Sequence, residues 1–102
     1  MKEQPKTVYW LRELPPLDAE ALGEHTLEAA SDRVPDTIAH REELWNQCKD
    51  DLMVRANERM IAEISRLGGR YAHVFEESID PKHDSIAGEA WLRGRFTYTL
   101  YR

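Results

Sequence analysis

The sequence predicts an α+β fold of β-β-α-β-β order, in which one long helix packs on a mostly antiparallel four-stranded sheet. Two observations support this prediction: one amphipathic segment with a helical period fills the middle of the chain, and segments rich in β-forming residues lie on both sides of it. A length of 102 residues, with 41% hydrophobic residues, suits one domain with a small core. We therefore expect residues 1–102 to form a single α+β domain, with residues 1–6 as a disordered start.

The central segment is expected to be helical from Asp36 to Leu67. Its apolar residues recur at steps of three or four and share one face: Trp45, Cys48, Leu52, Ala56, Met60, Ile64 and Leu67. Pro35 or Asp36 can start the helix, as a first-turn proline or a capping carboxylate. Gly68 and Gly69 can end it, because the left-handed conformation of a helix cap is favourable mainly for glycine.

This helix is long for so small a domain. At about 1.5 Å per residue it would span roughly 48 Å, whereas a compact domain of this size has a radius of gyration of ~13 Å. Either the helix is shortened or kinked near His40 and Arg41, or a second subunit covers the overhang. We favour the second alternative, because Leu44 and Trp45 would otherwise be exposed to water.

Four segments are expected to form the sheet: residues 7–14, a weaker candidate at 25–30, then 70–78 and 89–101. Residues 17–22 are expected to be a linker or one helical turn that Gly23 closes. Residues 80–85 are expected to form a loop, because they contain Pro81 and short polar side chains. In the last strand, Gly94 indicates a bulge or bend.

The last strand predicts how the sheet is used. One face would carry Ala90, Leu92, Gly94, Phe96, Tyr98 and Leu100, and the other Trp91, Arg93, Arg95, Thr97, Thr99 and Tyr101. One helix can cover only one face, so the second face would expose more aromatic surface than a monomer usually leaves in water. Self-association is therefore expected, with Trp10, Trp45, Trp91 and Tyr101 as anchors.

Composition argues against two classes of partner. A formal charge of −5 with no run of lysine or arginine argues against nucleic acid. The polar start and the absence of any apolar run near 18 residues predict neither a signal peptide nor a membrane span, so a cytoplasmic location is expected.

The single cysteine, Cys48, excludes an internal disulfide. Its place on the apolar helix face predicts a small buried side chain and not a nucleophile.

The order of features after the helix resembles the YbjQ-like family of small bacterial proteins. Residues 67–72, Leu-Gly-Gly-Arg-Tyr-Ala, correspond to the family's Leu-Gly-Ala-Asn-Ala-Val, with Arg70 in place of asparagine, and residues 88–90, Gly-Glu-Ala, correspond loosely to its Gly-Thr-Ala. The likeness covers roughly the C-terminal two-thirds of the chain as a pattern. It implies a helix-on-sheet fold, a ring-like homo-oligomer and, through a label attached to the family, heavy-metal binding. It supplies no catalytic residue.

A metal site is the most specific chemical prediction. His73, His83 and Asp84 are the candidate ligands, and Glu76, Glu77 and Asp80 lie between them. Imidazole and carboxylate groups bind divalent metals such as zinc, nickel or iron. The spacing matches no recognised motif, so a solvated loop is the alternative that we favour.

A second candidate site lies on the last strand. Arg93 and Arg95 beside Trp91 could bind a small anionic or planar ligand by stacking and by a guanidinium fork. The same residue types are enriched in subunit interfaces, which is the interpretation that we favour.

Our leading functional hypothesis is a small non-enzymatic protein that forms a homo-oligomer through its sheet and helix. The alternative is a binding module for a metal ion or a small anionic or planar ligand. An enzyme comes third, and we assign no catalytic residue.

Overall fold

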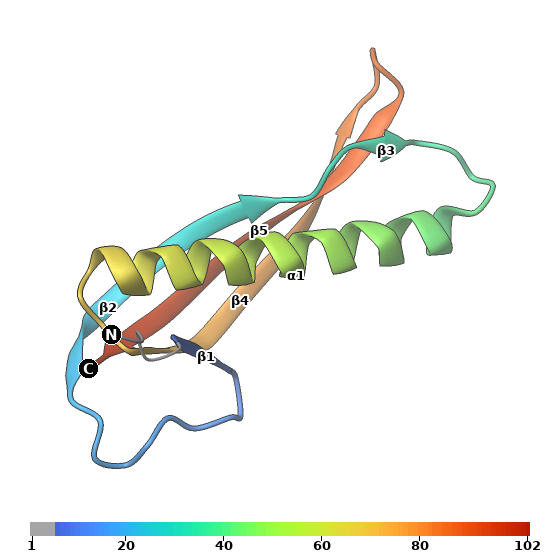
Figure 1. Cartoon of the computed structure of the whole chain (residues 1–102). Helices are drawn as coiled ribbons and strands as arrows, with labels where there is room; N and C mark the ends of the chain where they lie inside the picture. The colour runs from blue at the N-terminus through green and yellow to red at the C-terminus, as the bar shows by residue number, and fades with distance from the viewer. Residues whose placement is uncertain (1–5) are drawn as a thin grey trace.

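The computed structural model describes residues 6–102 and has one helix lying across a mixed sheet (Figure 1). In chain order the elements are β1 (Thr7–Trp10), β2 (Ala21–Ala30), β3 (Val34–Pro35), α1 (Arg41–Arg66), β4 (Tyr71–Asp84) and β5 (Glu89–Tyr101). The predicted α+β class and β-β-α-β-β order are confirmed, with β3 as an additional two-residue strand. The expectation of a disordered start lies outside the described residues except at Lys6, whose ammonium donates a 3.1 Å hydrogen bond to the Gly69 carbonyl.

β5 is the central strand of the sheet. The strand order is β1-β4-β5-β2, and β3 also pairs with β5. β1 is parallel to β4, whereas every other pair is antiparallel. The sheet is therefore mixed, with one short parallel strand at its edge.

The apolar stripe of α1 packs on the inner face of this sheet. Cys48, Leu52, Ala56, Met60 and Ile64 are buried on the helix, and the alternate residues Ala90, Leu92, Phe96, Tyr98 and Leu100 are buried on β5. These two sets form one continuous core cluster with residues of β2 and β4. Because each fully buried large aliphatic side chain contributes roughly 1.5–3 kcal/mol, this layer is the main source of stability.

The helix is shorter at its start than predicted. His40 has a left-handed backbone conformation (φ 57°), and the helix begins at Arg41. Its 26 residues span about 39 Å, within a molecule 49 Å long. Of the two alternatives, the shortened helix is what the structure shows. Leu44 and Trp45 pack at the border of the core, so no second subunit is required to cover them.

The predicted end of the helix is confirmed. Gly68 has a positive φ of 74°, and the amide of Gly69 donates to the Ile64 carbonyl at 2.9 Å. The left-handed residue therefore turns the chain directly into β4.

The loop predicted for residues 80–85 is wrong, because β4 continues to Asp84. Pro81 lies opposite Leu92 in the register. The N–H and C=O of Leu92 are both used by Ser31, on the β2 side of β5. Pro81 therefore occupies a position where the backbone nitrogen faces the free edge of β4, and there a missing N–H costs nothing.

Two further boundaries differ from the prediction. β1 ends at Trp10 and not at residue 14, since Leu11 has a positive φ of 53°. β2 begins at Ala21, earlier than the expected residue 25, and accommodates Gly23 (φ 140°) at an irregularity in its pairing with β5.

α1 is the one helix among residues 6–102, and it is not apolar enough to cross a membrane.

The packing of α1 on β5 makes Gly94 a sensitive position. A Cβ at this residue would lie 2.7 Å from two ring atoms of Phe96 and 3.2 Å from Leu52 Cδ2. We predict that Gly94→Ala lowers the free energy of unfolding by about 1–3 kcal/mol, as measured by urea denaturation.

The double variant Gly94→Ala/Phe96→Leu provides the control. If the collision with the ring is the cause, the two substitutions are less destabilising together than the sum of the single effects. Simple additivity would contradict the proposed cause.

Candidate functional site

The candidate site is the face of the sheet turned away from α1, called here the open face. Figure 1 shows α1 on one side of the sheet only, and no helix or strand of residues 6–102 covers the other side. On β5 the predicted alternation is confirmed, since the helix-facing residues are buried and those of the opposite face are exposed or half-buried. The open face carries Trp91, Arg93, Arg95, Thr97, Thr99 and Tyr101 of β5.

The middle of the open face is a charged groove. It has a volume of about 580 Å³ and is lined by side chains of β2, β4 and β5. Three of its charged residues are acidic and three are basic: Glu28, Glu76, Asp80, Lys82, Arg93 and Arg95. The groove is therefore close to neutral as a whole, although each charge is exposed.

Only part of this charge is paired within the chain. Arg93 donates to Glu28 Oε2 at 2.6 Å, and this hydrogen bond is the main reason why the pKa of Glu28 lies below its usual value. Within residues 6–102, neither Arg95 nor Glu76 has an oppositely charged group at ion-pair distance. Asp80 and Lys82 have no ion pair there either, so four charged side chains of the groove are available to a partner.

The aromatic residues of the open face lie at its two ends. At one end Tyr71 is directly opposite Tyr101 in the register, and the rings of Tyr9 and Tyr71 are 6.0 Å apart. At the other end the guanidinium of Arg33 lies 4.0 Å from the centre of the Trp91 ring. The expectation of an aromatic-rich face is therefore correct for the ends, whereas the centre is charged.

The predicted anchors divide between the two sides of the sheet. Trp91, Arg93, Arg95 and Tyr101 share the open face. Trp10 and Trp45 lie on the helix side, where Trp10 contacts Phe96 edge-on (5.7 Å between ring centroids) and Trp45 contacts His83 in the same way (5.9 Å). Trp10 and Trp45 are already packed within the chain, so the open face depends on the first four.

The structure does not bring the candidate metal ligands together. His73 and His83 belong to the same strand, ten residues apart, which corresponds to about 30 Å. His73 Nε2 lies 2.7 Å from the Leu11 carbonyl oxygen, and His83 Nδ1 lies 3.1 Å from Asp36 Oδ2. Within the described residues, no three histidine, cysteine or acidic side chains are arranged to hold a metal ion.

Asp84 serves the turn between β4 and β5. Its Oδ1 accepts hydrogen bonds from the amides of Ile86 and Ala87, both at 3.1 Å, and its Oδ2 accepts one from Arg33 at 3.4 Å. These contacts use both carboxylate oxygens, so Asp84 has a structural role in the chain.

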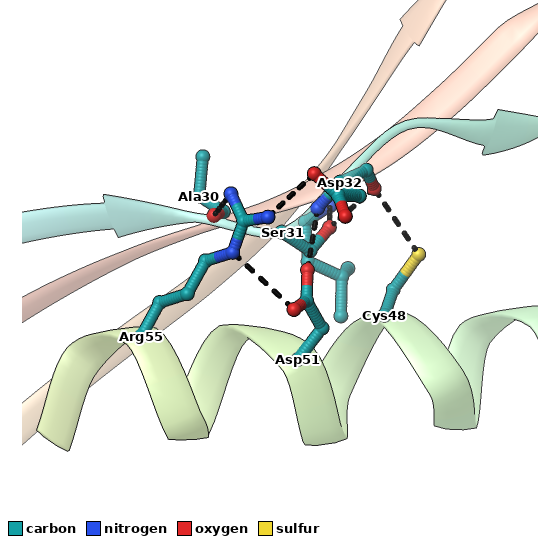
Figure 2. A network of polar contacts seen from close by, with 7 residues as sticks. Ala30, Ser31, Asp32, Cys48, Asp51 and Arg55 are labelled. Carbon is teal, nitrogen blue, oxygen red and sulfur yellow. Dashed lines mark hydrogen bonds and ion pairs between the residues drawn. The ribbon is translucent and has the colours of Figure 1, made fainter. Parts of the chain in front are cut away.

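Cys48 lies in a polar network between α1 and the end of β2 (Figure 2). Arg55 donates to Asp32 Oδ1 at 2.5 Å and to Asp51 Oδ1 at 3.2 Å, while Asp51 Oδ2 accepts the Asp32 amide at 2.6 Å. The Cys48 sulfur is buried and 3.8 Å from the Asp32 carbonyl oxygen. The network joins the helix to the strand. Arg55 binds the carboxylates of both Asp32 and Asp51, whereas the Cys48 thiol faces a backbone carbonyl, which suits a structural side chain better than a nucleophile.

The acidic half of the groove was not found from the sequence. β4 has a bulge at Phe75, because Val74 pairs with Tyr98 whereas Glu76 pairs with Thr97. The residues of β4 that share the open face therefore change from odd to even numbers, from His73 to Glu76. A strict two-residue period cannot place both His73 and Glu76 on one face. The shift becomes visible only in the pairing of β4 with β5.

Comparison with known proteins finds no matching family model, no similar curated protein and no similar solved structure.

The hydrogen bonds at Asp84 predict a pH dependence. The amides of Ala87 and Ile86, followed by Arg33, hold the pKa of Asp84 below its usual value. A lowered folded-state pKa stabilises the fold above the unfolded-state pKa of about 3.9, and this contribution is lost as the pH falls through the lower folded value. We expect Asp84→Ala to lower the thermal midpoint more at pH 7 than at pH 3. An equal decrease at both pH values would contradict this role of the carboxylate.

The network around Asp51 predicts a difference between two adjacent carboxylates. Asp51→Asn leaves one acceptor for two donors, so we expect a loss of about 1 kcal/mol in the free energy of unfolding. The matched control is Asp50→Asn, because Asp50 is the exposed residue just before Asp51 on the helix. This substitution should change the free energy of unfolding by less than about 0.5 kcal/mol. Equal effects in urea denaturation would contradict a structural role for the network.

Proposed function

We propose that this chain is a small non-enzymatic protein that assembles with copies of itself through the open face. The observation that carries the proposal is a sheet face with half-buried aromatic side chains at both ends and no covering element within residues 6–102. Such a face is stabilised when a second layer removes it from water.

The size of the face suits a stable interface. The sheet is about 43 Å long along the 13 residues of β5 and, at three to four strands, about 15–20 Å wide. These dimensions correspond to a face on the order of 700 Å², close to the roughly 800 Å² per partner of a standard interface. A second copy could therefore form a complete interface without any contribution from α1.

The charges on the face favour a partner with the same surface. Acidic and basic side chains are equally numerous in the groove, so it attracts neither a polyanion nor a polycation strongly. A second copy supplies both signs of charge in equal number. For the same reason we propose that nucleic acid is not a partner.

A ligand-binding role is the second candidate, and the volume of the groove favours it. Arg95 has no ion-pair partner within residues 6–102 and could bind a small anionic or planar molecule in the groove, through its guanidinium. In native mass spectrometry this role predicts a monomer with additional mass, whereas the assembly role predicts an oligomer without it.

The family resemblance and the location remain proposals of the same kind. The likeness to the YbjQ-like family, and with it a bacterial origin, agrees with a homo-oligomer. A cytoplasmic location agrees with a single free cysteine, which suits a reducing compartment.

A matched pair of variants tests the assembly. Thr99 is half-buried on the open face, and Val54 is exposed on the outer side of α1. Thr99→Lys would bury an ammonium in the interface, so we expect the oligomer to dissociate, with at least a tenfold higher dissociation constant in analytical ultracentrifugation. Val54→Lys should leave it unchanged. A wild-type protein that remains monomeric over a 100-fold range of concentration would refute the proposal.

A further inference from the structure

The two ends of the open face differ in shape and chemistry. The strand register places side chains in lateral rows from the row of Tyr71 and Tyr101 to the row of Lys82 and Trp91. The first end carries three tyrosines, with Tyr9 beside Tyr71. The groove occupies the middle and reaches Lys82 towards the second end, where Trp91 lies beside Arg33 and does not line the groove. A partner of the same sequence therefore presents a cluster of tyrosines at one end and a charged groove next to a single tryptophan at the other.

Two simple twofold arrangements can bring the open faces of two copies together, and only one of them places the tyrosine end of one copy over the opposite end of the other. A twofold axis parallel to the strands would place each β5 residue over itself, so that Arg95 would face Arg95 and Tyr101 would face Tyr101. An axis in the interface and perpendicular to the strands keeps β5 over β5 but reverses its direction. The aromatic end of each copy then lies over the groove of the other, and the arrangement closes as a dimer.

We propose that the chain forms this second arrangement, a face-to-face dimer with antiparallel β5 strands in which the tyrosine end of each copy fills the groove of its partner. The inference rests on the proposed assembly through the open face and adds the occupant, the symmetry and the register. Placing Tyr101 over the partner's Trp91 puts the axis at the midpoint between residues 91 and 101, at the level of Phe96.

This register pairs Arg95 and Glu76, two of the four charged side chains of the groove that have no ion-pair partner within residues 6–102; the other two are Asp80 and Lys82. With the axis between Thr97 and Arg95, Arg95 of one copy lies over Thr97 of the other. Glu76 is directly opposite Thr97 in the register of β4 and β5. Neighbouring strands are about 4.8 Å apart and packed sheets about 10 Å apart, which is within reach of an arginine and a glutamate side chain. The symmetry produces two Arg95–Glu76 pairs per dimer.

A mixing experiment with opposite charge reversals tests the register. In Arg95→Glu each pair becomes two carboxylates, and in Glu76→Arg each becomes two guanidinium groups. We expect each variant alone to have a dissociation constant at least tenfold higher than that of the wild type, because like charges face each other twice. In a mixture, one of each variant restores both pairs, so a heterodimer should form with near wild-type affinity.

Native mass spectrometry distinguishes the heterodimer by its mass. The control is Glu58→Arg, an equal charge reversal at an exposed position of α1, which should remain a wild-type-like dimer. Circular dichroism should show wild-type helix content in all variants, since Arg95 and Glu76 are exposed in the chain. An effect within one chain could not be rescued by mixing, so rescue specifically supports contact between copies.

Failure of this inference can be separated from failure of the proposed function. A monomeric wild-type protein would refute both. A wild-type dimer whose affinity is unchanged by the single reversals, or whose variants do not form a heterodimer, would refute the register and leave assembly through the open face intact.

A cross-linking experiment provides a second, independent measurement. In this register Thr99 of one copy lies over position 93 of the other, because each of these residues is three positions from the axis. In a Cys48→Ala background, a mixture of Thr99→Cys and Arg93→Cys should be joined by a short bismaleimide, whereas neither variant alone should be joined to itself. Self-linking of Thr99→Cys would indicate the parallel arrangement and overturn the antiparallel one.

Discussion

The packing of the apolar stripe of α1 against alternate residues of β5 is the contact on which the rest of the structure depends. Among the strands of residues 6–102, β5 pairs with β2, β3 and β4, so the position of the helix over β5 also sets the position of the sheet beneath it. Leu52, Met60 and Ile64 on the helix and Phe96, Tyr98 and Leu100 on the strand are all fully buried or nearly so. Gly94 allows the closest approach, since a Cβ there would meet both Phe96 and Leu52. One helix can form this contact on one side only, and the open face is its direct consequence.

The exposed edges of β2 and of the second half of β4 are poor templates for a further strand. Arg59 and Arg55 extend from α1 to the carbonyls of Glu28 and Ala30 on the outer edge of β2, and Asp51 accepts the amide of Asp32. The free edge of β4 carries charged side chains, and Pro81 offers no N–H there. These features disfavour the addition of a further strand along β2 and along the part of β4 that β1 does not cover. This protection is consistent with the proposed assembly through the open face.

Several residues that the sequence marked as candidate ligands have structural roles in the fold. The cluster of histidine and acidic residues in β4 was a candidate metal site when viewed along the chain, but an extended strand separates its ends by about 30 Å. Asp84 became a turn residue and His83 a partner of Asp36 and Trp45. In contrast, Arg93, Arg95 and Trp91 lie together because a strand places every second residue on one face. Proximity in sequence was misleading for the first group and informative for the second, since only the second follows the two-residue period.

By itself, the sequence determined the fold class, the helix with its glycine end, and the two faces of the last strand, because hydrophobic periodicity and glycine conformation are local properties. Tertiary structure alone decided the strand order, the extension of β4 through Pro81, and the bulge at Phe75 that moves Glu76 to the open face. Those features depend on pairing with β5. The hydrogen bonds of the neighbouring strand decide whether a proline is tolerated and which side of the sheet a carboxylate faces. A local sequence pattern contains no information about that strand.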